Sequence, residues 1–437
     1  MSSPEDTIVA VATPPGTGGI GVVRISGAES GRIARAMLGS LPEARLATYA
    51  TFMDAAGEPL DKGLALYFPA PASFTGEPVL ELHGHGGPVV MSLLVEAAVG
   101  LGARRAEPGE FTRRAFLNGK LDLAQAEAVA DLIASGTEQA ARAALRSLSG
   151  AFSIAVHGLA EQLTAIRVYV EAAIDFPEEE IDFLADDELA SRLEGCAASF
   201  ESLLSRATVG RVLRDGYQVV IVGKPNAGKS SLMNRLSGEE TAIVTEIAGT
   251  TRDVLRERIN IDGLAVELVD TAGLRDNPDR IEEEGIRRAR KAMAEADAVL
   301  WIQDASEATP GRIAEPVPDG IPVTIVRNKI DLTGEGPGIA AGEPPVVKLS
   351  AQTGAGLDAL RARIRELAGF RDLGEGAFTA RQRHVAALRD ARQHFEGGRA
   401  ALRDARAGEL LAEELRLAQQ ALGTITGEYT ADDLLCL

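Results

Sequence analysis

An eight-residue segment constrains the fold of this chain more than any other feature. It reads Gly223-Lys224-Pro225-Asn226-Ala227-Gly228-Lys229-Ser230 and matches G-x-x-x-x-G-K-[ST], the phosphate-binding loop. An apolar run at 217–222 precedes it, and residues 231–236 after it favour a helix. Glycines let backbone N–H groups close around phosphate oxygens, and a helix N-terminus adds positive potential. The sequence therefore predicts a strand, a phosphate loop and a helix, with Lys229 at the β- and γ-phosphates and Ser230 on Mg²⁺.

A second motif predicts the metal and γ-phosphate side of the site. Asp270-Thr271-Ala272-Gly273 follows an apolar run at 264–269. An aspartate at such a strand end can hold Mg²⁺ through water, and the N–H of Gly273 can face a γ-phosphate.

Two further segments predict the base. Asn328-Lys329-Ile330-Asp331 follows an apolar run at 322–326, and Ser350-Ala351 follows 346–349. A carboxylate can accept both N1–H and N2–H₂ of guanine, which adenine does not offer, and Ser350-Ala351 can place a backbone N–H near the guanine O6. Ligands of parallel sheets bind at the carboxyl ends of strands, where all these motifs fall. Together they favour GTP over ATP.

Composition bounds the class of protein. The chain has 437 residues, a formal net charge of −19 and two cysteines, too few for a disulfide scaffold. The N-terminus resembles no targeting peptide and no apolar run reaches membrane-spanning length, so we expect a cytoplasmic protein without a membrane segment. Because so acidic a surface repels a phosphate backbone, a nucleic-acid substrate would need a local basic patch or a basic partner.

The distribution of residue types along the chain predicts a multidomain α/β and α+β protein. Residues 1–118 carry short β-type runs, 119–212 and 371–437 read as helical, and 213–370 alternate strands with helices. A periodic stretch runs from 138 to 170, and residues 380 to 422 are again rich in Ala, Leu and Arg and read as helical. Asp262-Gly263 predicts a type I′ hairpin at one edge of the central sheet. The simplest arrangement is an N-terminal α+β domain and a helical domain in two parts, into which a Ras-like GTPase domain is inserted.

Three other patterns admit a second interpretation. Residues 16–21 match G-x-G-x-x-G, but a β-branched run follows where a dinucleotide site needs a helix. Glu81, His83 and His85 alternate on a strand, which suits a metal site or a polar pocket wall. The run from 175 to 188 holds eight acidic residues and no basic one, typical of a solvated segment or of a surface for cations or a basic partner.

Longer blocks resemble a known family. Residues 6–16, 80–87, 107–128 and 175–180, together with Gly249-Thr250-Thr251-Arg252-Asp253 and residues 270–275, are similar to the tRNA-modification GTPases called MnmE or TrmE. The resemblance covers nearly the whole chain. It implies a homodimer that works with the FAD-dependent protein MnmG (GidA) in a heterotetramer-type complex. This complex installs an aminomethyl-type group on carbon 5 of the tRNA wobble uridine.

The resemblance also implies site residues. The N-terminal domain would bind 5-formyl- or methylene-tetrahydrofolate, through Arg24, Glu81 and Lys120, and form the dimer. K⁺ would take the place of an arginine finger, held by Asn226, Thr245, Ile247 and Thr250, and Thr251 would join Ser230 on Mg²⁺. The GTP-binding set would be Gly223, Asn226, Ala227, Gly228, Lys229, Ser230, Ser231, Thr245, Glu246, Ile247, Ala248, Gly249, Thr250, Thr251, Asp270, Thr271, Ala272, Gly273, Asn328, Lys329, Asp331, Ser350 and Ala351.

Water activation is the least constrained role. Leu274 directly follows Gly273, so the glutamine that Ras-like enzymes use to position water is absent there. The resemblance implies Glu282 as the catalytic residue, although the adjacent Glu283 and Glu284 leave the position open. Arg252 and Arg275 could act as arginine fingers in cis or pack the switch segments.

The C-terminus departs from the family. Family chains end in Cys-Ile-Gly-Lys, whereas this one ends in Cys436-Leu437, a shortened tail in which Cys436 is not clearly the family cysteine. We expect GTPase activity to be intact, and the shortened tail puts modification activity in question. The alternative function is a ribosome-assembly or RNA-associated regulatory GTPase. Such a protein needs a basic RNA-binding module, against which the charge of −19 argues.

Overall fold

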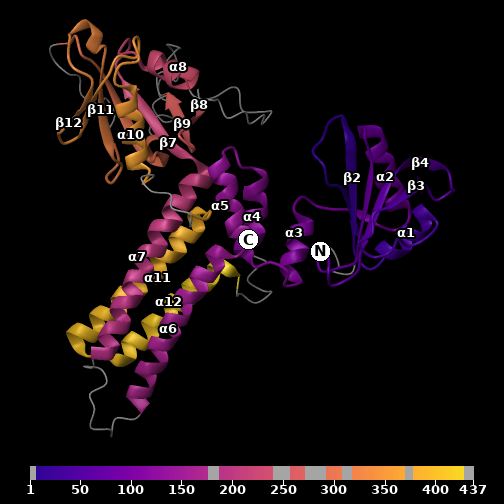
Figure 1. The fold of residues 1–437 in the computed structure, drawn as a ribbon. Coiled ribbons are helices and arrows are strands. Elements are labelled where there is room, and N and C mark those ends of the chain that lie inside the picture. The colour runs from indigo at the N-terminus through magenta and orange to yellow at the C-terminus, as the bar shows by residue number, and fades with distance from the viewer. Residues whose placement is uncertain are drawn as a thin grey trace, which may run out of the picture. The chain divides into compact units, whose positions relative to one another are not determined.

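The computed structural model describes residues 6–175, 187–239, 256–270, 292–307, 317–369 and 377–427. The chain divides into two compact units, Met1–Glu127 and Ala128–Leu437. Figure 1 colours them from indigo at the N-terminus to yellow at the C-terminus. The predicted segment boundaries at 118, 212 and 370 stay predictions.

The first unit is built on a six-stranded sheet in the order β3-β4-β5-β2-β1-β6. Neighbours pair antiparallel, apart from the parallel pair of β1 and β6. The glycines at 18–21 lie in or at the start of a strand, and the chain continues along that strand to Ser26. The strands are β1 (Ile8–Val11), β2 (Gly18–Ser26), β3 (Thr48–Met53), β4 (Pro59–Phe68), β5 (Val79–Gly86) and β6 (Arg104–Arg105).

One face of this sheet is covered by helices. Successive side chains of a strand point to opposite faces, so Val23, Ile25, Leu80 and Leu82 share a face. All four are fully buried in one core with side chains of α1 (Ser30–Leu38) and α2 (Pro88–Gly100). The residues between them, including Arg24 and Glu81, therefore lie on the other face. The unit's third helix is α3 (Glu110–Leu117).

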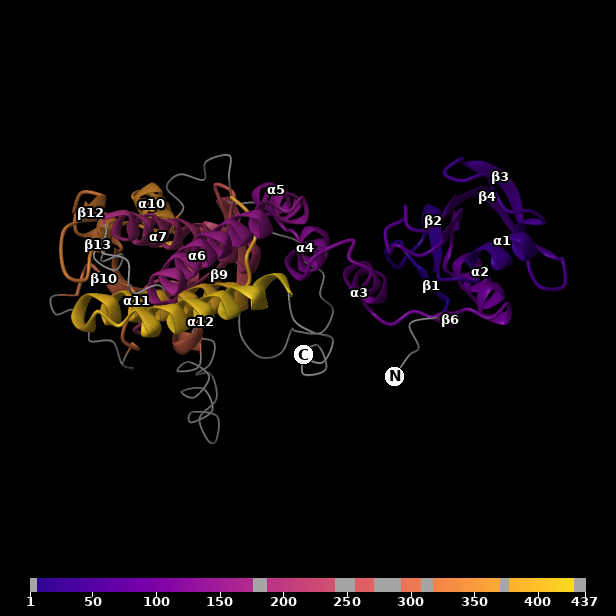
Figure 2. The same cartoon turned by 90° about the horizontal axis from the view of Figure 1, so that it is seen from below.

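Four long helices of the second unit form a bundle. Each packs on two others: α6 on α7 and α12, and α11 on α7 and α12. Figures 1 and 2 show them running alongside one another. The helical segments before and after the second sheet therefore come together. The helices are α4 (Leu123–Ile133), which begins in the first unit, α5 (Glu138–Leu148), α6 (Ala151–Asp175), α7 (Asp187–Asp215), α11 (Gln382–Ala405) and α12 (Gly408–Thr426).

Each of the helical stretches predicted at 138–170 and 380–422 contains two helices. The first breaks at Gly150 and the second at Arg406, both in the left-handed backbone region with φ of +89° and +51°. That conformation ends a helix. The apolar period resumes after each break, which is why periodicity alone suggests one continuous stretch.

The second sheet has seven strands in the order β12-β13-β11-β10-β7-β9-β8. Its five central strands are parallel, and an antiparallel strand closes each edge. The strands are β7 (Tyr217–Gly223), β8 (Arg256–Ile261), β9 (Leu264–Asp270), β10 (Ala298–Asp304), β11 (Val323–Asn328), β12 (Gly338–Ala340) and β13 (Val346–Lys348). The accompanying helices include α8 (Lys229–Glu239), the 3₁₀ turn η3 (Ile330–Leu332) and α10 (Leu357–Leu367).

Edge pairing confirms one prediction and adds a feature that was not predicted. Ile261 pairs with Leu264, and the two residues between them, Asp262 and Gly263, have φ of +50° and +91°. Positive φ at both central positions is the signature of the predicted type I′ turn. The pair β12–β13 at the opposite edge was not predicted.

This sheet is buried on both faces. In β7, Val219 and Ile221 belong to the core that contains Leu232 of α8, whereas Val220 and Val222 belong to a second core with Met293. Strands covered on both faces read as continuous apolar runs, as 217–222 does. Because both faces of this sheet are covered, a ligand can reach its strands only at their ends.

Candidate nucleotide-binding site

The phosphate loop connects β7 to α8 and is built on close backbone approaches. Gly223 has φ of +156°, and a Cβ there would lie 2.5 Å from the carbonyl oxygen of Ile302. Gly228 has φ of +94°, and a Cβ there would lie 2.2 Å from Nδ2 of Asn328. Asn226 adopts φ of +63°, a region that asparagine tolerates. Both glycines of the motif are therefore required by neighbouring strands as well as by phosphate.

Lys229 is the first residue of α8, and its ammonium group lies over the loop. Its Nζ donates to the carbonyl oxygens of Gly223 at 2.9 Å and Lys224 at 2.8 Å, and the residue is only 6% exposed. Ser230 and Ser231, next in the helix, are exposed. The structure thus holds a buried cation where the motif predicts the β- and γ-phosphates.

Asn328 joins the phosphate loop to the predicted base loop. Its Nδ2 donates to the carbonyl oxygen of Ala227 at 3.0 Å, and its Oδ1 accepts from the N–H of Ala351 at 2.9 Å. The side chain is 2% exposed, and Ser350 beside Ala351 is fully buried. In this structure the N–H of Ala351, one of the two residues predicted to place a backbone N–H near guanine O6, therefore donates to Asn328. This bridging role has no signature in the linear motif.

The rest of the base loop lies at the same edge of the sheet. Lys329 has φ of +67° and directly follows β11, and Asp331 is exposed in η3. The predicted residues Gly223, Ala227, Gly228, Lys229, Asn328 and Ala351 are thus brought together at the carboxyl ends of β7, β11 and β13.

Several predicted residues lie outside the described part of the chain. These are the segments 245–251 and 271–273, Glu282, Glu283 and Glu284, Arg252, Arg275 and Cys436, together with most of the acidic run at 175–188. The backbone of Asp270 ends β9, next to β7. The switch, water-activating and K⁺ assignments that depend on these residues stay predictions.

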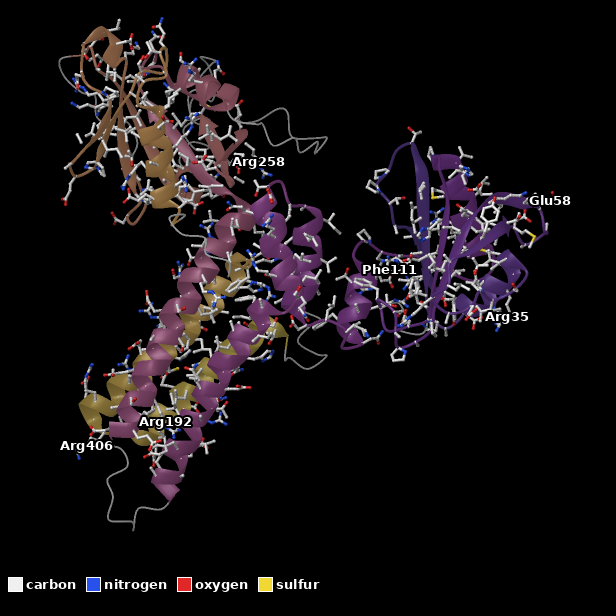
Figure 3. All side chains as sticks on the ribbon, in the orientation of Figure 1. Arg35, Glu58, Phe111, Arg192, Arg258 and Arg406 are labelled. Carbon is white, nitrogen blue, oxygen red and sulfur yellow. The ribbon has the colours of Figure 1, made fainter. Side chains whose placement is uncertain are left out.

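A second group of predicted residues lies in the first unit. Arg24 of β2 and Glu81 of β5 are paired across the strands, and Nε of Arg24 donates to Oε1 of Glu81 at 2.8 Å. The Arg24 guanidinium lies 5.6 Å from the ring centre of Phe74 and 5.8 Å from that of Phe111. Phe111 is labelled on α3 in Figure 3. The two aromatic rings were not predicted, because residues 74 and 111 approach Arg24 only in the folded unit.

Lys120 reaches this group through one loop. Its Nζ donates to the carbonyl oxygen of Pro71 at 3.2 Å, and the segment 69–78 that contains Pro71 also carries Phe74. Two of the three residues predicted to bind folate therefore contact each other, and the third contacts the loop beside them.

The histidines near Glu81 take different partners. His83 contacts Glu81 at 3.2 Å, whereas His85 contacts Asp61 at 2.7 Å. Within the described residues, no group of three or more His, Cys, Asp or Glu side chains is arranged to hold a metal ion. In the same residues, no helix has the length and apolar character needed to cross a membrane.

The fold and the site define a P-loop GTP-binding protein with additional domains. Comparison with known proteins makes the assignment specific. The profile described as the MnmE helical domain matches residues 123–436, and that described as the GTP-binding protein TrmE N-terminus matches residues 7–120. The chain belongs to the MnmE/TrmE family.

Solved structures similar to parts of the chain are GTP-binding proteins. The G domain of the Thermotoga maritima FeoB iron transporter is 23% identical, with a TM-score of 0.25 over 35% of this chain and 98% of that one. A GTP-binding protein from Sulfolobus solfataricus in complex with GDP is 18% identical, with a TM-score of 0.26 over 48% of this chain and 66% of that one. The family assignment rests on the two profiles.

Proposed function

We propose that this protein is a GTP-hydrolysing enzyme of tRNA modification. The observation that carries the proposal is the phosphate loop joined through Asn328 to a guanine-type base loop, in a chain whose remaining parts match the MnmE/TrmE family. The reaction served would be the addition of an aminomethyl-type group to carbon 5 of the tRNA wobble uridine, together with an FAD-dependent partner.

The described residues fit a nucleoside triphosphate. Lys229 offers a buried cation to the β- and γ-phosphates, while the N-terminus of α8 adds positive potential. Asp331, exposed in η3, is free to accept the two N–H donors of guanine. Asn328 holds the two loops in register, so that phosphate and base are bound at a fixed distance from each other.

The cations proposed to neutralise the γ-phosphate would be held by residues of the phosphate loop and of a later segment. The exposed hydroxyl of Ser230 fits a Mg²⁺ ligand, with Thr251 as its proposed partner. Asn226, Thr245, Ile247 and Thr250 are the proposed K⁺ ligands. Bound cations would neutralise charge that develops between the β- and γ-phosphates. Glu282 is the proposed residue that orients the attacking water.

The first unit is proposed to bind a tetrahydrofolate derivative. The Arg24–Glu81 pair presents a donor and an acceptor beside two aromatic rings, which suits a flat heteroaromatic ring with hydrogen-bonding edges. The exposed Lys120 suits the carboxylates of a glutamyl tail. The folate would supply the one-carbon unit, and the protein would act as a homodimer with MnmG and tRNA.

Two measurements test the proposal. The first is phosphate release from GTP by the purified chain in KCl and in NaCl, with Lys229→Ala as the inactive control. We expect faster release in KCl. The second is mass spectrometry of wobble uridine in a host that lacks its own homologue. Hydrolysis without any restored modification would support the alternative, a regulatory GTPase, and absence of hydrolysis in both salts would refute the enzyme assignment.

A further inference from the structure

The segment Asp304–Glu307 lies between the two loops of the nucleotide site but belongs to none of the GTP-binding motifs. It leaves the carboxyl end of β10, which lies in the sheet between β7 and β11. The phosphate loop follows β7 and the base loop follows β11. Whatever binds across those two loops must therefore pass the end of β10.

Asp304 is bound to the base loop. Its Oδ2 lies 2.6 Å from Nζ of Lys329, and the two side chains are 14% and 31% exposed. Its Oδ1 accepts from the N–H of Ser306 at 2.9 Å and from the hydroxyl of Ser306 at 2.6 Å. The Lys329 ammonium group, followed by the Ser306 hydroxyl, lowers the pKa of Asp304 to about 2. The carboxylate is therefore ionised at neutral pH and fixed by three contacts.

The backbone of the same segment is tied to β11. The N–H of Ala305 donates to the carbonyl oxygen of Asn328 at 2.8 Å, and the Arg327 guanidinium donates to the carbonyl oxygen of Ala305 at 3.3 Å. A second ion pair, between Glu307 and Lys224 of the phosphate loop at 2.6 Å, is about half exposed on both sides. Exposed pairs of this kind contribute little, so Asp304 is the stronger of the two carboxylate contacts.

The role of Asp304 follows from the entropy that a mobile lysine side chain loses when a ligand binds. A lysine side chain loses up to about 2 kcal/mol of rotamer entropy when a ligand orders it. At Lys329 the left-handed backbone, with φ of +67° and ψ of +35°, fixes the start of the side chain, and Asp304 fixes its end. The alkyl chain between these two fixed points is then ordered before any base arrives.

We propose that Asp304 is a positioning residue for guanine nucleotides, holding Lys329 extended so that its alkyl chain forms one wall of the base pocket. The inference rests on the proposed GTP binding. It assigns nucleotide affinity to a residue 24 positions before Asn328 in the sequence. Asp304 acts through Lys329 and does not itself contact the nucleotide.

The test is a double-mutant cycle on the full chain, read by titration with a fluorescent GDP analogue. Asp304→Asn keeps an acceptor for Ser306 and removes the charge that holds Lys329. Lys329→Met keeps the alkyl chain and removes the ammonium group. We expect each variant to weaken binding about tenfold, which corresponds to about 1.4 kcal/mol, and the double variant to be no weaker than either single one.

A matched control separates positioning from general ion-pair loss. Asp262→Asn removes the charge from a 3.0 Å ion pair with Arg365 at the β8–β9 turn, where β9 begins, at the opposite end of the sheet from the site. Asparagine is tolerated at its positive φ. We expect unchanged GDP affinity. Because its carboxylate has a lowered pKa in the fold, Asp304→Asn should unfold at a lower temperature than this control, and both variants should be folded at the temperature of the titration.

The outcomes separate the inference from the function beneath it. If the unmodified chain fails to bind the GDP analogue, the proposed GTP binding and this inference are both wrong. If it binds but Asp304→Asn binds equally well, only the inference is overturned. Additive losses of affinity in the double variant would show that Asp304 does not act through Lys329 and would also overturn it.

Discussion

The two sheets of this protein place their polar side chains in different positions. In the six-stranded sheet, Arg24 and Glu81 stand in the middle of neighbouring strands and face away from the helix-covered core. In the seven-stranded sheet, Asn328 ends β11, and Lys229 begins α8 directly after the loop that follows β7. The difference follows from burial, because an antiparallel sheet can leave one face open and a parallel sheet between two cores cannot.

This difference decides how a site can be recognised. A site at strand ends is made of short loops, so its residues are contiguous in sequence and form motifs. A site on an open face is made of residues two apart on several strands, and no contiguous motif marks it. The first unit also carries a charge network around the buried Glu110, which pairs with Arg104 and Arg114.

The largest effect should come from the strand-end site. Lys229→Ala removes the buried cation of the phosphate loop and its contacts to the carbonyls of Gly223 and Lys224. We expect kcat/KM for GTP to fall by a factor on the order of 10³, measured by phosphate release. Arg365→Ala, at the other end of the sheet, serves as control and should leave the rate unchanged. A Lys229→Ala enzyme with more than a tenth of the activity would show that charge at this strand end is dispensable.

The second largest effect should be on stability and should lie in the first unit. Glu110 is buried and accepts from Arg104 at 2.6 and 2.9 Å, from Arg114 at 3.1 Å and from the N–H of Glu107 at 2.8 Å. Arg104 above all lowers the pKa of Glu110 from 4.5 to about 2. Glu110→Gln should therefore lower the free energy of unfolding of this unit at pH 7 by about 3 kcal/mol.

The pH dependence of that loss identifies its cause. A carboxylate with a lowered pKa stabilises the fold above its unfolded value of 4.5, and this stabilisation disappears as the pH falls towards 2. Urea unfolding of the wild type and of Glu110→Gln should converge over this range. A difference that stays constant between pH 7 and pH 3 would mean that packing, not charge, is responsible.

What the sequence could predict also differs between the strand-end site and the site on the sheet face. The phosphate loop, the base loop and the Asp262-Gly263 hairpin were predicted because each depends on adjacent residues. The bridge from Asn328 to Ala227 was not, since its partners are 101 residues apart. Arg24 was identified only by resemblance to a family, whereas Glu81 was also noted for its alternation with His83 and His85. Phe74 and Phe111 beside them were missed. The helix breaks were missed because an amphipathic period continues across them.

A third and smaller effect tests the close approach between the phosphate loop and Asn328. In Gly228→Ala the new Cβ would lie 2.2 Å from Nδ2 of Asn328, at a φ of +94°. We expect a loss of about 2 kcal/mol in unfolding free energy and weaker nucleotide binding. Gly238→Ala, in the helix α8 that follows this loop, has no atom within 4 Å and no positive φ and is the control. It should be neutral or slightly stabilising. Equal effects at both positions would refute the close approach.

The smallest effect on stability should be at Glu81, although this residue is proposed to bind ligand. Glu81 and Arg24 are 14% and 29% exposed, so their ion pair is partly hydrated, and Glu81→Gln should change the unfolding free energy by less than about 1 kcal/mol. Calorimetric titration with 5-formyl-tetrahydrofolate should nevertheless show lost binding, whereas Glu58→Gln, on the exposed turn before β4 (labelled in Figure 3), should bind normally.

The change in unfolding free energy and the change in folate binding have to be interpreted together. A residue on an open sheet face that costs little stability but abolishes binding is there for a ligand. If Glu81→Gln instead destabilised the unit as much as Glu110→Gln and left folate binding intact, the open face would be structural. The contrast between the two sheets would then fail.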